Sequence, residues 1–146
     1  MANADLVFSI ANWIVLVGWA ALLLAPLRRE GAILLARIAA ALVAGIYVTL
    51  VIRGVAMGPG LPEGAGFSSL AGVEALLSTR AAILGGWVHF LTFDLFVASW
   101  IVEDAPRAGV PHWLLVPAIL LTLFAGPAGL LLYLLIAGGF RLAARR

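Results

Sequence analysis

Apolar residues fill four long stretches of this chain. A helix needs roughly 20 apolar residues to cross the hydrocarbon core of a bilayer. The stretches that reach this length cover residues 6–25, 31–52, 81–102 and 112–139. The last one is longer than a perpendicular crossing needs, so we expect it to tilt, break or extend past the core. The pattern predicts an all-α, integral membrane four-helix bundle that forms a single transmembrane domain over residues 1–146.

A shorter pattern lies between the second and third apolar stretches. Over residues 67–79, apolar side chains recur near the helical period, and polar side chains lie largely on the opposite face. A helix of this length is too short to cross a bilayer. We therefore expect a short amphipathic helix that lies in the membrane interface. A lid over the mouth of the bundle is the second interpretation of the same pattern.

The composition agrees with a membrane protein and excludes several other classes. Hydrophobic residues make up 64% of the chain and charged residues only 11%, whereas a soluble domain has roughly 25% charged residues. All nine basic residues are arginines, and they are scattered, so no basic run could follow a nucleic-acid backbone. The absence of cysteine excludes disulfides, thiolate metal sites and cysteine nucleophiles.

Two ionisable residues fall near the middle of the third apolar stretch. His89 and Asp94 lie within a turn of its midpoint, where a charged side chain costs roughly 2.5 kcal/mol or more. Such residues face protein or water, and they are candidates for function. Five residues at about 100° each set the two side chains about 140° apart, so each needs its own partner on another helix. Trp87 shares the face of Asp94. Asn12 and Arg37 are the candidate partners from the first two helices.

Both residues also have a structural interpretation. A buried contact of Asp94 with an arginine or asparagine often only locks helices together, and this is about as consistent with the sequence as catalysis. For His89, a structural role is somewhat favoured over a catalytic one. Metal or haem binding is disfavoured because the chain has two histidines and no paired ligand motif. We expect no metal.

The fourth apolar stretch contains a different irregularity. Pro127 cannot donate a backbone hydrogen bond, which leaves the carbonyl of Leu123 without its helical partner. Gly126 lets another helix or a ligand approach the backbone closely. The pattern predicts either a packing kink or one wall of a ligand pocket. In the second stretch, small residues four apart predict a tight helix contact; they are Ala36, Ala40 and Ala44.

A series of motifs extends over the second half of the chain. It consists of Gly86-Trp87-Val88-His89, Phe93-Asp94-Leu95-Phe96-Val97, Trp100, Asp104-Ala105, Gly109-Val110-Pro111-His112, Pro117, Leu121-Thr122 and Gly126-Pro127-Ala128-Gly129-Leu130-Leu131-Leu132-Tyr133. Together these motifs resemble the signature of the abscisic-acid-deficient-four family. Plant members of that family act in xanthophyll metabolism, at the conversion of violaxanthin to neoxanthin. The short chain resembles a bacterial member.

The resemblance implies a membrane protein related to neoxanthin synthase that acts on a carotenoid or a similar isoprenoid. Converting an epoxide end group into an allenic alcohol is an isomerisation, which needs an acid and a base in a dry, apolar cleft. It needs no redox cofactor, so we expect none. His89 and Asp94 are the candidate catalytic residues. Their separation lets them act on opposite sides of a substrate only if the polyene wraps around the third helix.

Further residues are candidates for contacts with such a substrate. They comprise aromatic side chains of the third helix and polar or small residues of the other three. They are Trp87, Phe90, Phe93, Asn12, Arg37, Gly126 and Pro127.

Two other classes of function stay open. A non-catalytic helical membrane subunit or pigment-binding protein would use His89 and Asp94 to hold the bundle or a partner. A proton-coupled transporter comes third, because we find no internal repeat. The expected partners are an apolar isoprenoid or carotenoid ligand and the lipid bilayer, without nucleic acid. Assembly into a homo-oligomer or a larger membrane complex also stays open.

The arginines flank the four helices almost evenly. With four crossings, the side that holds both termini carries five arginines and the opposite side carries four. The positive-inside rule does not decide between such similar counts. The tail Arg145-Arg146 favours both termini in the cytoplasm. We therefore expect a multi-pass protein of the bacterial inner membrane in that orientation.

Overall fold

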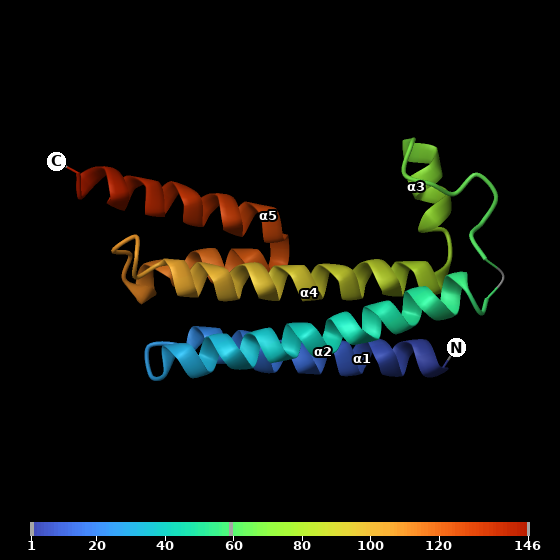
Figure 1. Cartoon of the computed structure of the whole chain (residues 1–146), viewed down its shortest axis with the longest axis horizontal. Helices are drawn as coiled ribbons and strands as arrows, with labels where there is room; N and C mark the ends of the chain where they lie inside the picture. The colour runs from blue at the N-terminus through green and yellow to red at the C-terminus, as the bar shows by residue number, and fades with distance from the viewer. Residues whose placement is uncertain (1, 59, 146) are drawn as a thin grey trace.

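The part of the chain that the structure describes folds into four long helices and one short helix. The structure is a computed structural model that describes residues 2–58 and 60–145. Its helices are α1 (Ala2–Leu23), α2 (Arg29–Val55), α3 (Leu70–Leu76), α4 (Arg80–Asp104) and α5 (His112–Ala143) (Figure 1). The four long helices are long and apolar enough to cross a membrane. The predicted all-α class is confirmed, and the predicted helices begin and end within four residues of these bounds.

Helices α1, α2 and α4 pack along one another, and small residues set their spacing. Ala36 and Ala40 of α2 are buried, as the small-residue pattern predicts. Gly18 of α1 lies directly against Ala36: a Cβ atom there would come 3.3 Å from the Cα of Ala36 and 2.7 Å from a methyl group of Leu95. The approach of α1 to α2 and α4 therefore depends on this glycine.

Replacing Gly18 with valine should destabilise the bundle. The added methyl groups have no space between α1 and α2, and overpacking of this kind costs about 1–3 kcal/mol. Thermal unfolding of detergent-solubilised protein, followed by tryptophan fluorescence, measures the loss. Gly45→Val is the control in α2, because a Cβ atom at Gly45 meets nothing within 4 Å. Equal stability of the two variants would contradict the tight contact at Gly18.

The short helix α3 stands across the bundle axis. It rises roughly perpendicular to α4, above the first residues of that helix (Figure 1). The hydroxyl of Ser69 caps it by accepting from the backbone N–H of Gly72 at 3.1 Å. Its apolar residues stay largely outside the core, with Leu70 76% exposed. A helix in this direction lies along the membrane plane when α4 crosses the bilayer, which fits an interfacial helix.

The last helix does not run straight. Ala125 has non-helical dihedral angles (φ −151°, ψ 68°), directly before Gly126 and Pro127. Pro127 supplies the cause, since its ring and missing N–H disrupt the preceding turn. Figure 1 shows α5 folding back at this point, so that its two halves run antiparallel beside α4. The two ends of the chain consequently lie at opposite ends of the bundle, whereas a straight fourth helix would have brought them together.

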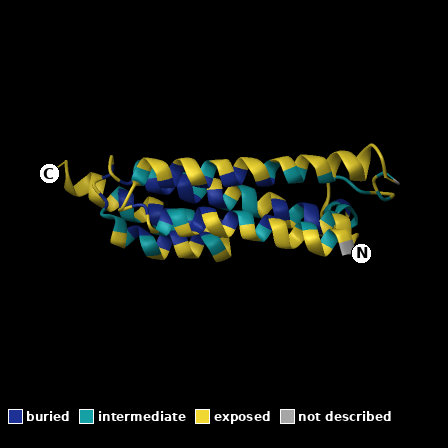
Figure 2. Cartoon of the chain, turned by 90° about the horizontal axis from the view of Figure 1, so that it is seen from below, coloured by how far each residue is buried: buried dark blue, intermediate teal, exposed yellow. Residues whose placement is uncertain are grey.

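Burial follows this arrangement. The buried residues gather mainly in the half of the bundle toward the C-terminus, where α5 adds its two segments to the other helices (Figure 2). Among them are Leu115 and Tyr133 of α5 and Ile101 of α4, each 0% exposed. The opposite half consists mainly of α1, α2 and α4 and exposes more of its surface. A residue at the middle of α4 therefore lies at the boundary between the half of the bundle that α5 covers and the half that it leaves exposed.

Candidate functional site

Asp94 lies at the boundary between the more buried and the more exposed half of the bundle. It lies in the middle of α4, is neither fully buried nor fully exposed, and belongs to a helix that packs against α1, α2 and α5. Within residues 2–58 and 60–145, no hydrogen bond or ion pair engages its carboxylate; the chain's ion pairs involve Asp5, Glu103 and Asp104 instead. A carboxylate at membrane depth without a protein partner is available to a ligand or a proton.

The bend of α5 reaches this carboxylate. Gly126 is buried, and a Cβ atom there would lie 2.7 Å from the Cγ of Asp94. A Cβ atom at this position would overlap the carboxyl group where it lies, so the glycine allows this close approach. Ala125 and Pro127 on either side make this the segment where the helical hydrogen-bonding pattern is broken. Irregular backbone is tolerated at membrane depth where protein buries it or where it lines a cavity. The structure thus brings together Asp94, Gly126 and Pro127.

His89 lies elsewhere on α4, as its angular offset predicts. Its ring is 4.7 Å from that of Phe93 and 5.4 Å from that of Tyr47 in α2, measured between centroids. Phe90 lies 6.1 Å away in an edge-on arrangement. His89 is exposed at the surface of the helical bundle. The histidine therefore belongs to an aromatic cluster between α2 and α4, not to the Asp94 site.

Trp87 shares the face of Asp94 two turns earlier in α4. Its indole stacks on Phe8 of α1, with ring centroids 5.9 Å apart and planes inclined by 30°. The two rings line a shallow groove between α1 and α4 of about 350 Å³. Ile83 and Leu84 complete its apolar wall. An ion pair between Arg80 and Asp5 closes the groove at the end of the bundle that holds the N-terminus.

Neither candidate partner from the sequence engages Asp94. The amide of Asn12 donates to the backbone carbonyl of Phe8, one turn earlier in its own helix, at 2.7 Å. Arg37 pairs with Glu103 instead, its Nη2 donating to Oε2 at 2.5 Å. An arginine at this position can extend in either direction along the bundle, and it extends toward the end of α4, where it meets a carboxylate near the membrane surface.

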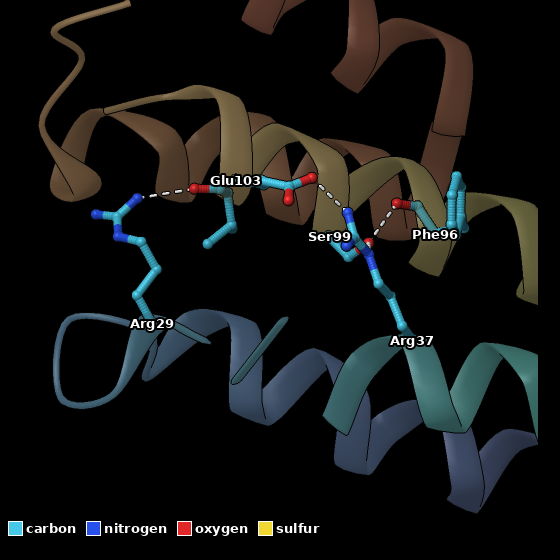
Figure 3. A network of polar contacts seen from close by, with 6 residues as sticks. Arg29, Arg37, Phe96, Ser99 and Glu103 are labelled. Carbon is cyan, nitrogen blue, oxygen red and sulfur yellow. Dashed lines mark hydrogen bonds and ion pairs between the residues drawn. The ribbon is translucent and has the colours of Figure 1, made fainter. Parts of the chain in front are cut away.

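Arg37 and Glu103 belong to a polar layer that the sequence did not indicate. Arg37 also donates to the hydroxyl of Ser99 at 3.4 Å, and Ser99 in turn donates to the carbonyl of Phe96 at 2.7 Å (Figure 3). Arg29, at the start of α2, donates to a backbone carbonyl at the end of α4 at 2.7 Å. These contacts tie α2 to α4 on the side of the α1–α2 turn, which suits a structural role.

The Glu103→Gln variant should lose stability. The neutral amide leaves the half-buried guanidinium of Arg37 without its charged partner, and a hydrogen bond to a charged group contributes about 1.5–3 kcal/mol. The midpoint temperature of unfolding in detergent should fall by several degrees. Glu63→Gln, in the exposed loop before α3, is the matched control and should leave the midpoint unchanged. An unchanged midpoint for Glu103→Gln would remove this pair from the interactions that hold α2 on α4.

A second polar cluster holds the returning half of α5. The hydroxyl of Tyr133 and the guanidinium of Arg141 both donate to Oδ2 of Asp104, each at 2.5 Å. The ring of Tyr133 also meets Trp100 edge-on at 5.6 Å. These contacts could not be predicted from the sequence, because no pattern in it indicates that the chain returns along the bundle.

We also searched the described residues for side chains that could hold a metal ion. Within the described ranges, no three side chains of His, Cys, Asp or Glu gather in one place. The chemistry available at the Asp94 site is that of one carboxylate, the backbone groups of a broken helix and apolar walls.

Comparison with known proteins agrees with the resemblance in the motifs. The sequence profile of a family described as ABA DEFICIENT 4-like matches residues 6–133. This range takes in α1, α2, α3, α4 and the bend of α5. Neither the curated proteins nor the solved structures contain a match to this chain.

Proposed function

Because the chain belongs to the ABA DEFICIENT 4-like family, we propose that it acts on a carotenoid or a similar apolar isoprenoid by acid–base isomerisation without a cofactor, in the bacterial inner membrane. Asp94 is the group that transfers the proton. The observation that carries this proposal is a carboxylate at the middle of a membrane helix, unpaired among the described residues, beside the broken backbone at Gly126. Family membership supports the substrate class at the level of neoxanthin-synthase-related proteins.

The proposed reaction opens an epoxide end group. The carboxylate of Asp94 removes a proton from the polyene carbon next to the epoxide. The electron pair of that C–H bond forms a second, adjacent double bond, while the C–O bond at the neighbouring epoxide carbon breaks. The oxygen stays on the other ring carbon and takes up a proton, so the product is an allenic alcohol. Atoms and electrons balance without an oxidant, and an apolar site keeps water away from the intermediate charge.

The aromatic residues are assigned to the polyene. Trp87 and Phe8 line the groove on the same side of α4 as Asp94, and we assign them contacts with the chain of the substrate. His89 is the second candidate for a proton transfer. Its ring lies closest to Phe93 and to Tyr47 of α2, on another face of α4, so it would meet a different part of the substrate from Asp94.

Pigment analysis of a carotenoid-producing bacterial host tests the proposal. Expression of the chain in hosts that accumulate epoxidised carotenoids should produce a new pigment of unchanged mass with an allenic alcohol end group. Chromatography with mass spectrometry separates isomers of equal mass. Unchanged pigments in every background would exclude this function. Pigment that copurifies with the protein but is never converted would favour the alternative, a pigment-binding protein in which the His89 cluster contacts the ligand.

A further inference from the structure

Helix α5 is long enough to cross a membrane, yet its two halves are individually short. At 1.5 Å per residue, His112–Phe124 rises about 20 Å and Gly126–Ala143 about 27 Å. The hydrocarbon core is about 30 Å thick. The halves run antiparallel in Figure 1, from the end of α4 to the middle of the bundle and back. The first half is too short to cross the core, and the second half, near the lower limit of length for a crossing, starts at the middle of the bundle and returns to the end where α5 begins.

Side-chain contacts hold this return path. Gly129 of the second half packs against Thr122 of the first half, where a Cβ atom would collide with it. Farther along, Arg141 reaches Asp104, the last residue of α4. His112 starts α5 beside the end of α1, donating to the carbonyl of Leu23 at 3.2 Å. The beginning and the end of α5 thus lie at the same end of the bundle.

The burial of one face of α4 shows how far along that helix the bend of α5 reaches. Ile83, Trp87 and Phe90 lie on the face of Asp94, before it in the chain, and are 59%, 43% and 62% exposed. Ala98 and Ile101 continue the same face after Asp94 and are 0% exposed. The covering of this face by α5 therefore stops at Asp94, near the middle of α4.

The arginines distinguish the two ends of the bundle once α5 returns. On the side of the α1–α2 turn, the described helix ends and turns carry Arg28, Arg29, Arg107, Arg141 and Arg145. On the other side they carry Arg53 and Arg80. Four crossings would divide the arginines almost evenly between the two sides. With the return of α5, the side of the α1–α2 turn carries a clear excess of them. By the positive-inside rule, the arginine-rich side faces the cytoplasm.

We propose that α5 is a re-entrant hairpin that enters the membrane from the cytoplasmic side, meets Asp94 at the midplane and returns. The chain then crosses the membrane three times, with its N-terminus outside and its C-terminus in the cytoplasm. The hairpin closes the cytoplasmic half of the Asp94 site, so a ligand reaches the carboxylate from the outer half, over the exposed face of α4. The proposed topology stands independently of the proposed function, whereas the path of the ligand to Asp94 rests on that function.

Cysteine labelling tests the topology directly, because the chain contains no cysteine. Single variants Leu27→Cys, Glu63→Cys and Ala144→Cys place a thiol in the α1–α2 turn, in the loop after α2 and after α5. In intact cells of a Gram-negative host, a membrane-impermeant maleimide should label only Glu63→Cys. In inverted membrane vesicles it should label the other two. Labelling of Ala144→Cys together with Glu63→Cys, from either side, would overturn the re-entrant hairpin.

A crosslinking measurement gives an independent answer. A bifunctional maleimide with a span of about 10 Å should join the cysteines of the Asp104→Cys/Arg141→Cys double variant, since the native side chains are in contact. If α5 crossed the membrane, these positions would be separated by about the 30 Å core and would not react with each other. The Asp104→Cys/Arg53→Cys pair is the negative control. Neither readout uses enzymatic activity, so a failure here is distinct from a failure of the proposed function.

Discussion

The Asp94→Asn variant is expected to lose product formation by at least about 100-fold, the usual contribution of a general acid or base. Asparagine keeps the size and polarity of the side chain but cannot accept and return a proton. Conversion is measured as the fraction of epoxidised carotenoid that becomes the isomer in the producing host. The amount of folded protein is measured in parallel by detergent extraction and size-exclusion chromatography.

The structure separates a catalytic role of Asp94 from a structural one. Within the described residues, the carboxylate makes no hydrogen bond or ion pair that the amide would break, so folding should be unaffected. Glu74→Gln, an exposed carboxylate of α3, is the control and should retain both protein and conversion. If Asp94→Asn reduced folded protein as much as product, the carboxylate would hold the helices together and the catalytic assignment would be wrong.

The helices could be predicted from the sequence because hydropathy reports length and polarity directly. Each long helix is a run of apolar residues bounded by charged, proline or glycine residues, and α3 shows its own helical period. The path of α5 could not be predicted in this way. Hydropathy is the same for a helix that crosses the membrane and for one that turns back. The kink at Pro127 was predictable, but its direction depends on tertiary contacts such as Gly129 on Thr122 and Arg141 on Asp104.

For the candidate site, the sequence likewise predicts the positions of residues within their own helices but not their partners on other helices. The rarity of ionisable residues at membrane depth identified Asp94, and the helical angle correctly separated it from His89. Gly126 was identified as a place of close approach, and the structure brings Asp94 to it. The position of Arg37 within α2 makes it a candidate partner of Asp94, but its long side chain reaches Glu103 instead. Sequence fixes the depth of a residue in its own helix, whereas partners depend on how neighbouring helices are offset.

A substitution at Gly126 tests the site in a second way, because it should displace the carboxylate of Asp94 without removing its charge. A methyl group at this position would occupy the space of the Asp94 carboxyl group. The atoms it meets belong to the end of a side chain with two rotatable bonds, so Asp94 can turn aside while the helices stay packed. A displacement of about 1 Å in a catalytic group can reduce the rate about 100-fold. Gly126→Ala should therefore lower conversion by a factor of this order, with little change in stability.

The control for this substitution lies in the same helix. A Cβ atom at Gly138 meets nothing within 4 Å, so Gly138→Ala should retain full conversion, and the higher helix propensity of alanine should leave the protein at least as stable. Combining Gly126→Ala with Asp94→Asn discriminates further. If the glycine acts only by placing the carboxylate, the double variant should be no less active than Asp94→Asn alone. A further loss in the double variant would show that the α5 backbone at Gly126 contributes to the site independently of Asp94.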